Sequence, residues 1–171
     1  MQSIMKTNLL YSLLCTGLLI STTAHAATSA SKAELERGHY LVKTSGCNDC
    51  HTPGYPQSNG KIPESDWLLG NAVAFQGPWG ATYPSNLRLK IHAMTESQWL
   101  VEARKERRPP MPWFNLAAMS DKDLKAIYRY ISSLGAKGQP APDFVPPGQA
   151  VNTPYIEFVP KNLPKAVEAA K

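Results

Sequence analysis

The stretch Cys47-Asn48-Asp49-Cys50-His51 decides how the rest of this chain is interpreted. It has the pattern C-x-x-C-H, in which two thiols stand three positions apart and a histidine follows directly. Thiols at this spacing can each form a thioether bond to one of the two vinyl groups of a single porphyrin. The neutral imidazole of His51 is then placed to bind the iron as an axial ligand. The pattern therefore predicts one covalently attached haem c, held by Cys47, Cys50 and His51.

Two other uses of the cysteine pair remain open. A thioredoxin-like redox pair also has C-x-x-C, but no β-α-β pattern surrounds it here. A structural zinc site needs four ligands, and His39 and His92 could join the thiolates, although their spacing does not suit it. The sequence motifs G-x-S-x-G, H-E-x-x-H and the P-loop do not occur, which disfavours the hydrolases and nucleotide-binding enzymes that use them. The histidine directly after Cys50 favours haem over both alternatives.

The N-terminus has the layout of a secretory signal peptide. Lys6 supplies a positive charge, and residues 9–20 form an apolar segment that is too short to span a bilayer comfortably. Ala24-His25-Ala26 then matches a small-x-small cleavage site. We expect residues 1–26 to be removed and the mature protein to be periplasmic, without a transmembrane segment. Cys15 would be lost with the signal peptide.

The charge balance disfavours a nucleic-acid-binding protein. The chain has 171 residues, a formal net charge of +5 and a pI near 9.1, and its basic residues are mostly dispersed. One dense group contains Arg104, Lys105, Arg107 and Arg108. It is either a solvated helix end, where the helix dipole favours cations, or a docking surface for an acidic redox partner. We favour the first interpretation, because charge runs are usually solvated faces.

The length suits one globular domain, but the proline distribution divides the chain. All 15 prolines follow Thr52, and seven of them fall within residues 140–164. Such a tail cannot form a long helix and should run extended over the surface. We therefore expect a signal peptide at 1–26, a helical haem-binding domain at 27–136 and a Pro-rich extended C-terminal arm at 137–171.

Three helices are predicted from their capping residues and apolar spacing. They begin after Ser31, Thr95 and Ser120, whose hydroxyls can accept a backbone N–H bond. The first two also have a Glu or Gln three residues later, which completes a capping box. The third carries an apolar stripe at helical spacing and ends near Gly135, a suitable left-handed cap.

Pro109 and Pro110 should stop the second helix near Arg108. No convincing period-2 alternation marks a strand, and residues 52–94 have the composition of an ordered loop. The expected fold class is therefore all-α.

Gly38 marks an expected helix crossing. A glycine inside a helix costs about 1 kcal/mol relative to alanine. That cost is tolerated where a second helix approaches closely, and Gly38 lies on the apolar side of the first helix. Tyr128 on the third helix is the expected aromatic partner.

The distal iron ligand is predicted to be Met111. The other candidates, Met94 and Met119, each precede a helix cap and can form a hydrophobic staple with an apolar residue of that helix. Met111 lies instead in the stiff run Pro109-Pro110-Met111-Pro112, which presents a thioether at low entropic cost. A soft sulfur ligand favours reduced iron and raises the potential. An irregular core contact for Met111 and an imidazole ligand from His39 or His92 remain alternatives.

The chain resembles class I-type cytochromes c over about residues 33–135. The resemblance rests on Glu36-Arg37-Gly38-His39-Tyr40, the Cys47–His51 motif, Met111-Pro112-Trp113 and residues 116–134. Gly77-Pro78-Trp79-Gly80 and Tyr83-Pro84-Ser85-Asn86 are similar to monohaem relatives of the cytochrome subunits of bacterial periplasmic dehydrogenases. The resemblance implies a helical fold around one haem c, with His51 as proximal and Met111 as distal ligand.

The function that follows is one-electron transfer by a carrier that is not itself an enzyme. Its expected partners are a dehydrogenase as donor and a cytochrome or oxidase as acceptor. A haem sensor or haem enzyme with an open distal site is the main alternative, and a subunit that works only inside a larger complex is another. Trp79 and Trp113 either wall the haem, where an indole N–H could bond a propionate, or are simple core residues.

Overall fold

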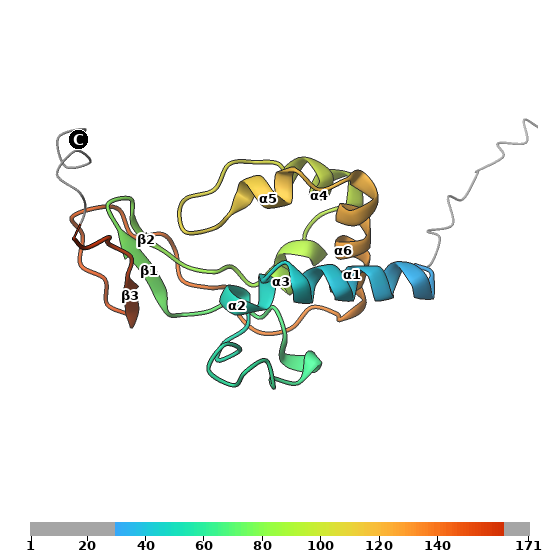
Figure 1. Ribbon diagram of the computed structural model, residues 1–171, viewed down its shortest axis with the longest axis horizontal. Helices are drawn as coiled ribbons and strands as arrows, with labels where there is room; N and C mark the ends of the chain where they lie inside the picture. The colour runs from blue at the N-terminus through green and yellow to red at the C-terminus, as the bar shows by residue number, and fades with distance from the viewer. Residues whose placement is uncertain (1–29, 163–171) are drawn as a thin grey trace, which may run out of the picture.

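The computed structural model describes residues 30–162, which form a group of helices with a small β-sheet at one end (Figure 1). The expected signal peptide at 1–26 lies outside the described residues. The helices are α1 (Lys32–Thr44), α2 (Cys47–His51), α3 (Leu87–His92), α4 (Glu96–Glu102), α5 (Trp113–Ala117) and α6 (Asp121–Ser133), with a 3-10 turn at Glu64–Asp66. The strands are β1 (Ala74–Gly77), β2 (Gly80–Thr82) and β3 (Tyr155–Glu157). Between residues 30 and 162, no helix is both long and apolar enough to cross a membrane.

The three predicted helix starts are confirmed. Ser31 caps α1 and Thr95 caps α4, each within a complete capping box, and Ser120 caps α6. Gly135 follows α6 with a positive φ of 75°, as a left-handed cap requires. The second predicted helix is shorter than expected, because α4 ends at Glu102 rather than near Arg108. At the C-terminal end of α4, the carboxylate of Glu102 binds Lys105 and Arg107. These ion pairs hold the following residues against the helix end, so the helix does not continue.

The expectation of an all-α fold was wrong in detail. β1 pairs antiparallel with β2 and parallel with β3, which gives a sheet of order β2-β1-β3. These strands have three or four residues, too few for a period-2 pattern to be recognised. The loop expected at 52–94 also contains α3, whose cap Asn86 accepts the backbone N–H of Leu89 at 3.1 Å.

The C-terminal arm follows both edges of the β1–β2 hairpin. On one edge, Val145 exchanges two backbone hydrogen bonds with Ala81, of 2.8 and 3.0 Å. On the other edge, β3 lies beside β1, and the N–H of Phe158 donates to the carbonyl of Gln76 at 2.6 Å. The arm is therefore attached to the hairpin by backbone bonds and not only by side chains.

The helical core is organised by the crossing of α1 and α6, which Figure 1 shows. A Cβ added to Gly38 would lie 2.5 Å from the Cβ of Tyr130 and even closer to the backbone carbonyl of Ala126. The crossing at Gly38 is thus present, but its aromatic partner is Tyr130 rather than Tyr128. Tyr128 is rotated about 200° from Tyr130 around the helix, and its hydroxyl donates to the carbonyl of Met94 at 2.8 Å.

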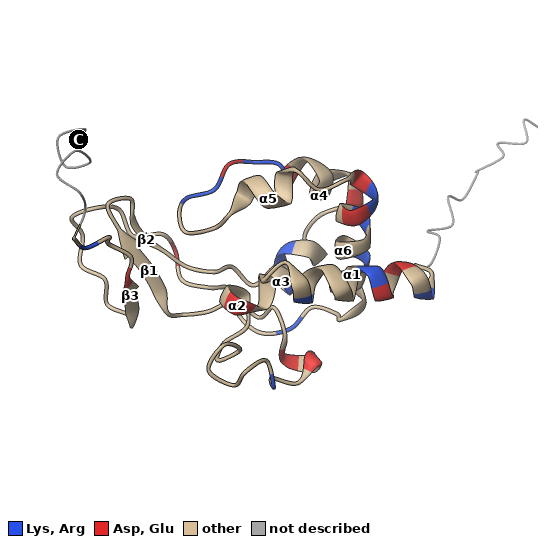
Figure 2. Cartoon of the chain, in the orientation of Figure 1, with Lys and Arg blue, Asp and Glu red and all other residues tan. Residues whose placement is uncertain are grey.

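The basic cluster expected at 104–108 is largely paired within the chain. Figure 2 shows its Lys and Arg residues along the segment between α4 and α5. Arg104 binds Asp121 at 2.6 Å, and Lys105 and Arg107 bind Glu102 at 2.7 and 2.9 Å. These pairs support a structural role for the cluster.

Candidate haem-binding site

The Cys47–His51 motif forms the short helix α2. The helix starts after Gly46, whose φ of 71° lets the chain turn sharply out of α1. Residues at i, i+3 and i+4 share one face of a helix, so Cys47, Cys50 and His51 lie on the same side of α2. Both thiols are free of disulfides and half-buried, while His51 is only 8% exposed. The motif is therefore folded into the body of the protein, with its three functional side chains on one side.

The orientation of His51 is fixed by Ser85. The Nδ1 atom lies 2.7 Å from the backbone carbonyl oxygen of Ser85. Because a carbonyl can only accept, Nδ1 carries the proton and Nε2 keeps its lone pair for a metal. Burial lowers the pKa of His51, which keeps the imidazole in the neutral form that binds iron.

A hydrogen-bond framework holds α2 against the chain that follows it. The N–H of Gly70 donates to the carbonyl of His51 at 2.8 Å. Gly70 itself has a φ of 80°, and a Cβ there would lie 2.7 Å from the nitrogen of Asn86. Glycine at this position thus lets residues 84–86 approach closely enough for Ser85 to reach His51.

The cysteines do not resemble a reactive redox pair. Burial raises the pKa of Cys47 to about 11, and burial also raises the pKa of Cys50. A nucleophilic C-x-x-C cysteine needs the opposite shift, since the thiolate is the reactive form. Among residues 30–162, no group of three or more His, Cys, Asp or Glu side chains is arranged to hold a metal, so no zinc ligand set gathers around the two thiols.

Met111 differs from the two other methionines in its surroundings. Met94 and Met119 are partly buried and pack against the hydrophobic core. Met111 is half-buried but does not belong to the core cluster of the described residues, and it lies in the loop between α4 and α5. The structure thus gives Met111 no packing role that would compete with ligation, and its assignment as distal ligand stays a prediction.

His39 and His92, the two alternative distal ligands, make contacts elsewhere in the fold. His39 stacks on Trp67 with ring centroids 5.4 Å apart, and Nε2 of His92 lies 3.1 Å from the carbonyl of Ser132.

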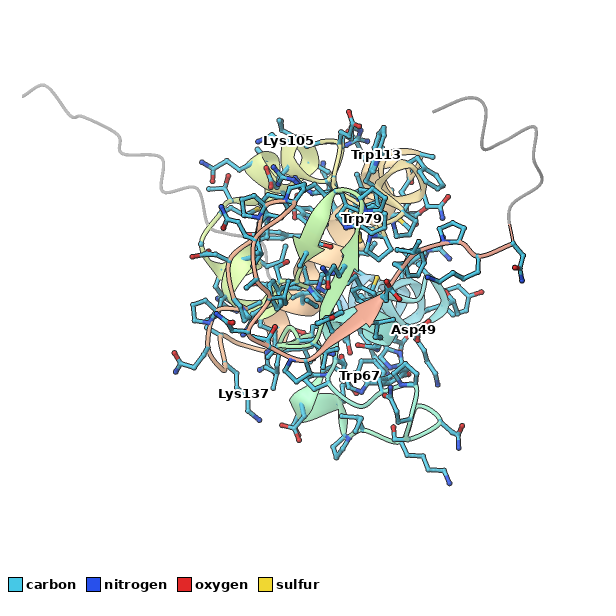
Figure 3. All side chains as sticks on the ribbon, turned by 90° about the vertical axis from the view of Figure 1, so that its left-hand side faces the viewer. Asp49, Trp67, Trp79, Lys105, Trp113 and Lys137 are labelled. Atoms are coloured by element: carbon cyan, nitrogen blue, oxygen red, sulfur yellow. The ribbon has the colours of Figure 1, made fainter. Side chains whose placement is uncertain are left out.

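The hairpin contains buried polar atoms that have no partner among the described residues. They are Nε1 of Trp79 and Oε1 of Gln76. Trp79 lies in the turn between β1 and β2 (Figure 3). A buried indole N–H without an acceptor suits a site where a bound group supplies one, as a haem propionate would. This orphaned donor, the two free thiols and the uncommitted Nε2 of His51 form a donor set that fits haem c.

Comparison with known proteins agrees with this chemistry. The family model described as cytochrome c matches residues 35–135, more than half of the chain. The chain belongs to the cytochrome c family, which implies covalently attached haem c, and the Cys47–His51 motif fits this cofactor.

A relative points to a more particular class. The chain is 29% identical over 127 residues to the fructose dehydrogenase cytochrome subunit of Gluconobacter japonicus. The similarity covers 68% of this chain but 24% of that subunit, so the chain spans about a quarter of the relative's length. No solved structure matches the chain. Together with the family, this relative identifies an electron-carrying cytochrome similar to dehydrogenase cytochrome subunits.

Proposed function

We propose that this protein is a periplasmic one-electron carrier that takes electrons from a dehydrogenase and passes them to a downstream cytochrome or oxidase. The observation that carries the proposal is the buried His51, whose Nδ1 is held by Ser85 while Nε2 remains uncommitted. Membership of the cytochrome c family and similarity to a dehydrogenase cytochrome subunit support the electron-carrier role. Export rests on the expected signal peptide at 1–26.

The residues proposed to hold the haem are Cys47 and Cys50 through thioethers, His51 as proximal ligand and Met111 as distal ligand. When bound, the haem supplies an iron that alternates between the ferrous and ferric states. Ser85 keeps the His51 imidazole in one tautomer and one orientation, so the proximal bond need not rearrange. With its thioether on the iron, Met111 would exclude water and small molecules, and this would separate a carrier from an enzyme.

Binding of carbon monoxide to the reduced protein tests this proposal. The wild-type protein should not bind carbon monoxide readily, because Met111 occupies the sixth position. Met111→Ala should bind it and should show a lower reduction potential. Met94→Ala and Met119→Ala are matched controls, which should lose about 1–3 kcal/mol of stability through core packing but leave the iron closed.

Two results would contradict parts of the proposal. If Met111→Ala stays closed to carbon monoxide at the wild-type potential, the distal assignment is wrong and His92 is the next candidate. If the wild-type protein itself binds carbon monoxide readily, the alternative of a haem sensor or enzyme replaces the carrier.

A further inference from the structure

The segment that carries Met111 is held by the hairpin and the C-terminal arm at two successive residues. The guanidinium of Arg108 lies over the ring of Phe144, 3.9 Å from its centroid. The carbonyl of the next residue, Pro109, accepts a hydrogen bond of 2.8 Å from the hydroxyl of Thr82. Thr82 ends β2, and Phe144 belongs to the arm beside β2. Both contacts lie two or three residues before Met111.

The Phe144 ring is itself fixed in place. Its neighbour Val145 exchanges two backbone hydrogen bonds with Ala81. A Cβ added to Gly80 would lie 3.1 Å from the ring atoms Cε2 and Cζ of Phe144, and Gly80 has a φ of 97°. The Phe144 ring therefore lies close to both Gly80 and Arg108, and the backbone bonds of Val145 hold it where the guanidinium can pack on it.

The prolines around Met111 make its position depend on where residues 108 and 109 are held. Pro109, Pro110 and Pro112 each have a fixed φ, which leaves few free torsions between the Pro109 carbonyl and Met111. On the other side, the carbonyl of Met111 accepts the N–H of Trp113 at 2.8 Å. Holding residues 108 and 109 thus restricts where the Met111 side chain can go.

We propose that Phe144, Arg108 and Thr82 are positioning residues, through which the C-terminal arm and the hairpin keep Met111 on the iron. The inference rests on the proposed role of Met111 as distal ligand. It gives the Pro-rich arm a function at the redox site, since the arm supplies the support for Arg108.

Imidazole binding to the ferric full-length holoprotein measures the proposed effect. Imidazole can bind only when Met111 has left the iron, so its apparent affinity reports the population of the open state. Phe144→Leu keeps an apolar side chain but removes the aromatic face, and it should raise the imidazole affinity roughly 3- to 10-fold. Thr82→Val removes the hydroxyl donor with little change in shape and should act in the same direction by a similar factor. Phe144→Tyr keeps the aromatic ring, so this variant should bind imidazole with the wild-type affinity.

Phe158→Leu is the matched control. Phe158 is another aromatic residue of the arm, and it packs on Phe75 and Trp79 with centroids 6.3 and 6.1 Å apart. Phe158→Leu should lower thermal stability while leaving the imidazole affinity unchanged. If Phe144→Leu and Thr82→Val behave like Phe158→Leu, the positioning role is wrong. If Phe144→Leu fails to give holoprotein, Thr82→Val and Arg108→Gln decide the question by the same measure.

The Met111→Ala background separates this inference from the function on which it rests. With Met111 absent, Phe144→Leu should change the imidazole affinity no further. If Met111→Ala opens the iron but Phe144→Leu and Thr82→Val do not, only the positioning role is overturned. If wild type and Met111→Ala bind imidazole equally well, the distal assignment falls, and the positioning role falls with it.

Discussion

At the scale of single residues, the hydrogen bond from His51 to the Ser85 carbonyl has the largest chemical consequence. The bond fixes which ring nitrogen carries the proton and leaves the other available to iron. Burial alone would lower the pKa of His51 without orienting the ring. The carbonyl of Ser85 therefore provides the orientation, and Gly70 provides the space that brings this carbonyl close.

A residue-scale prediction concerns the thioethers. Cys47→Ala and Cys50→Ala should each leave one thioether, and the double variant should give no stable holoprotein. The measurement is the mass of the denatured chain, which should include the haem in wild type and in both single variants. Cys15→Ala is the control, because Cys15 lies in the expected signal peptide and should not change the mature mass. A wild-type chain that releases its haem on denaturation would refute covalent attachment.

The site residues differ in how far the sequence could predict them. Cys47, Cys50 and His51 stand in one local motif, so their role in binding haem can be predicted from the sequence alone. Ser85 contributes a backbone carbonyl, which any residue type could supply, and no side-chain pattern marks such a role. Met111 could be singled out because its proline neighbours exclude helix and strand, whereas its anchors Phe144 and Thr82 depend on the tertiary fold.

At the scale of elements, the helix starts that depend on neighbouring residues were predicted better than the pairings between distant segments. The starts of α1, α4 and α6 follow from capping residues that act within one turn. β3 pairs with a strand that precedes it by more than 70 residues, so its own sequence carries little information about the pairing. The Gly38 crossing illustrates both cases, since the glycine was identified correctly but the facing residue was not.

The Gly38 crossing gives a prediction in which two effects oppose each other. Gly38→Ala should gain up to about 1 kcal/mol from helix propensity. The new Cβ would, however, meet Tyr130 at 2.5 Å and also the Ala126 backbone, which cannot move without shifting α6. Overpacking of this kind typically costs about 1–3 kcal/mol, so we expect net destabilisation in a urea unfolding experiment. A more stable Gly38→Ala protein would show that the helices do not meet there.

Tyr128→Phe tests the identity of the partner on α6. It should cost about 0.5–1.5 kcal/mol through the lost hydrogen bond to Met94. Because Tyr128 does not face Gly38, its effect should add to that of Gly38→Ala. Strong non-additivity would restore Tyr128 as the partner.

At the scale of the whole molecule, the C-terminal arm links parts that are distant in sequence. The side-chain amide of Asn86, the cap of α3, donates to the carbonyls of Lys137 and Gln139 at 2.8 and 3.1 Å. The hydroxyls of Tyr83 and Thr153 lie 2.6 Å apart. The composition of the arm indicated an extended chain, but these attachments arise from topology and could not be predicted from proline content. The domain boundaries at 136 and 137 stay a prediction.

Glu102 makes a further link, between α3, α4 and the loop that leads to Met111. Its carboxylate binds Lys90, Lys105 and Arg107 at 2.9, 2.7 and 2.9 Å. Hydrogen bonds from Lys105 and then Lys90 lower the pKa of Glu102 from 4.5 to about 2. The folded protein therefore favours the charged carboxylate more than the unfolded chain does.

This depressed pKa predicts how stability depends on pH. The contribution of Glu102 is fully present above its unfolded pKa of 4.5 and is lost as the pH falls toward 2. Glu102→Gln should therefore lower the free energy of unfolding at pH 7 by roughly 1–3 kcal/mol, a range that allows for water reaching part of the carboxylate. The difference from wild type should shrink between about pH 4.5 and pH 2, as measured by urea unfolding at several pH values.

Glu106→Gln separates this effect from a general change in charge. Glu106→Gln removes the same charge from the loop that follows α4, but Glu106 makes no ion pair within residues 30–162. Its substitution should leave the unfolding free energy within about 0.5 kcal/mol of wild type at every pH. Because Glu102 also holds Arg107, Glu102→Gln should loosen the loop before Met111 and raise imidazole binding at pH 7 as well. Equal pH profiles for the two variants would show that the low pKa of Glu102 does not stabilise the fold.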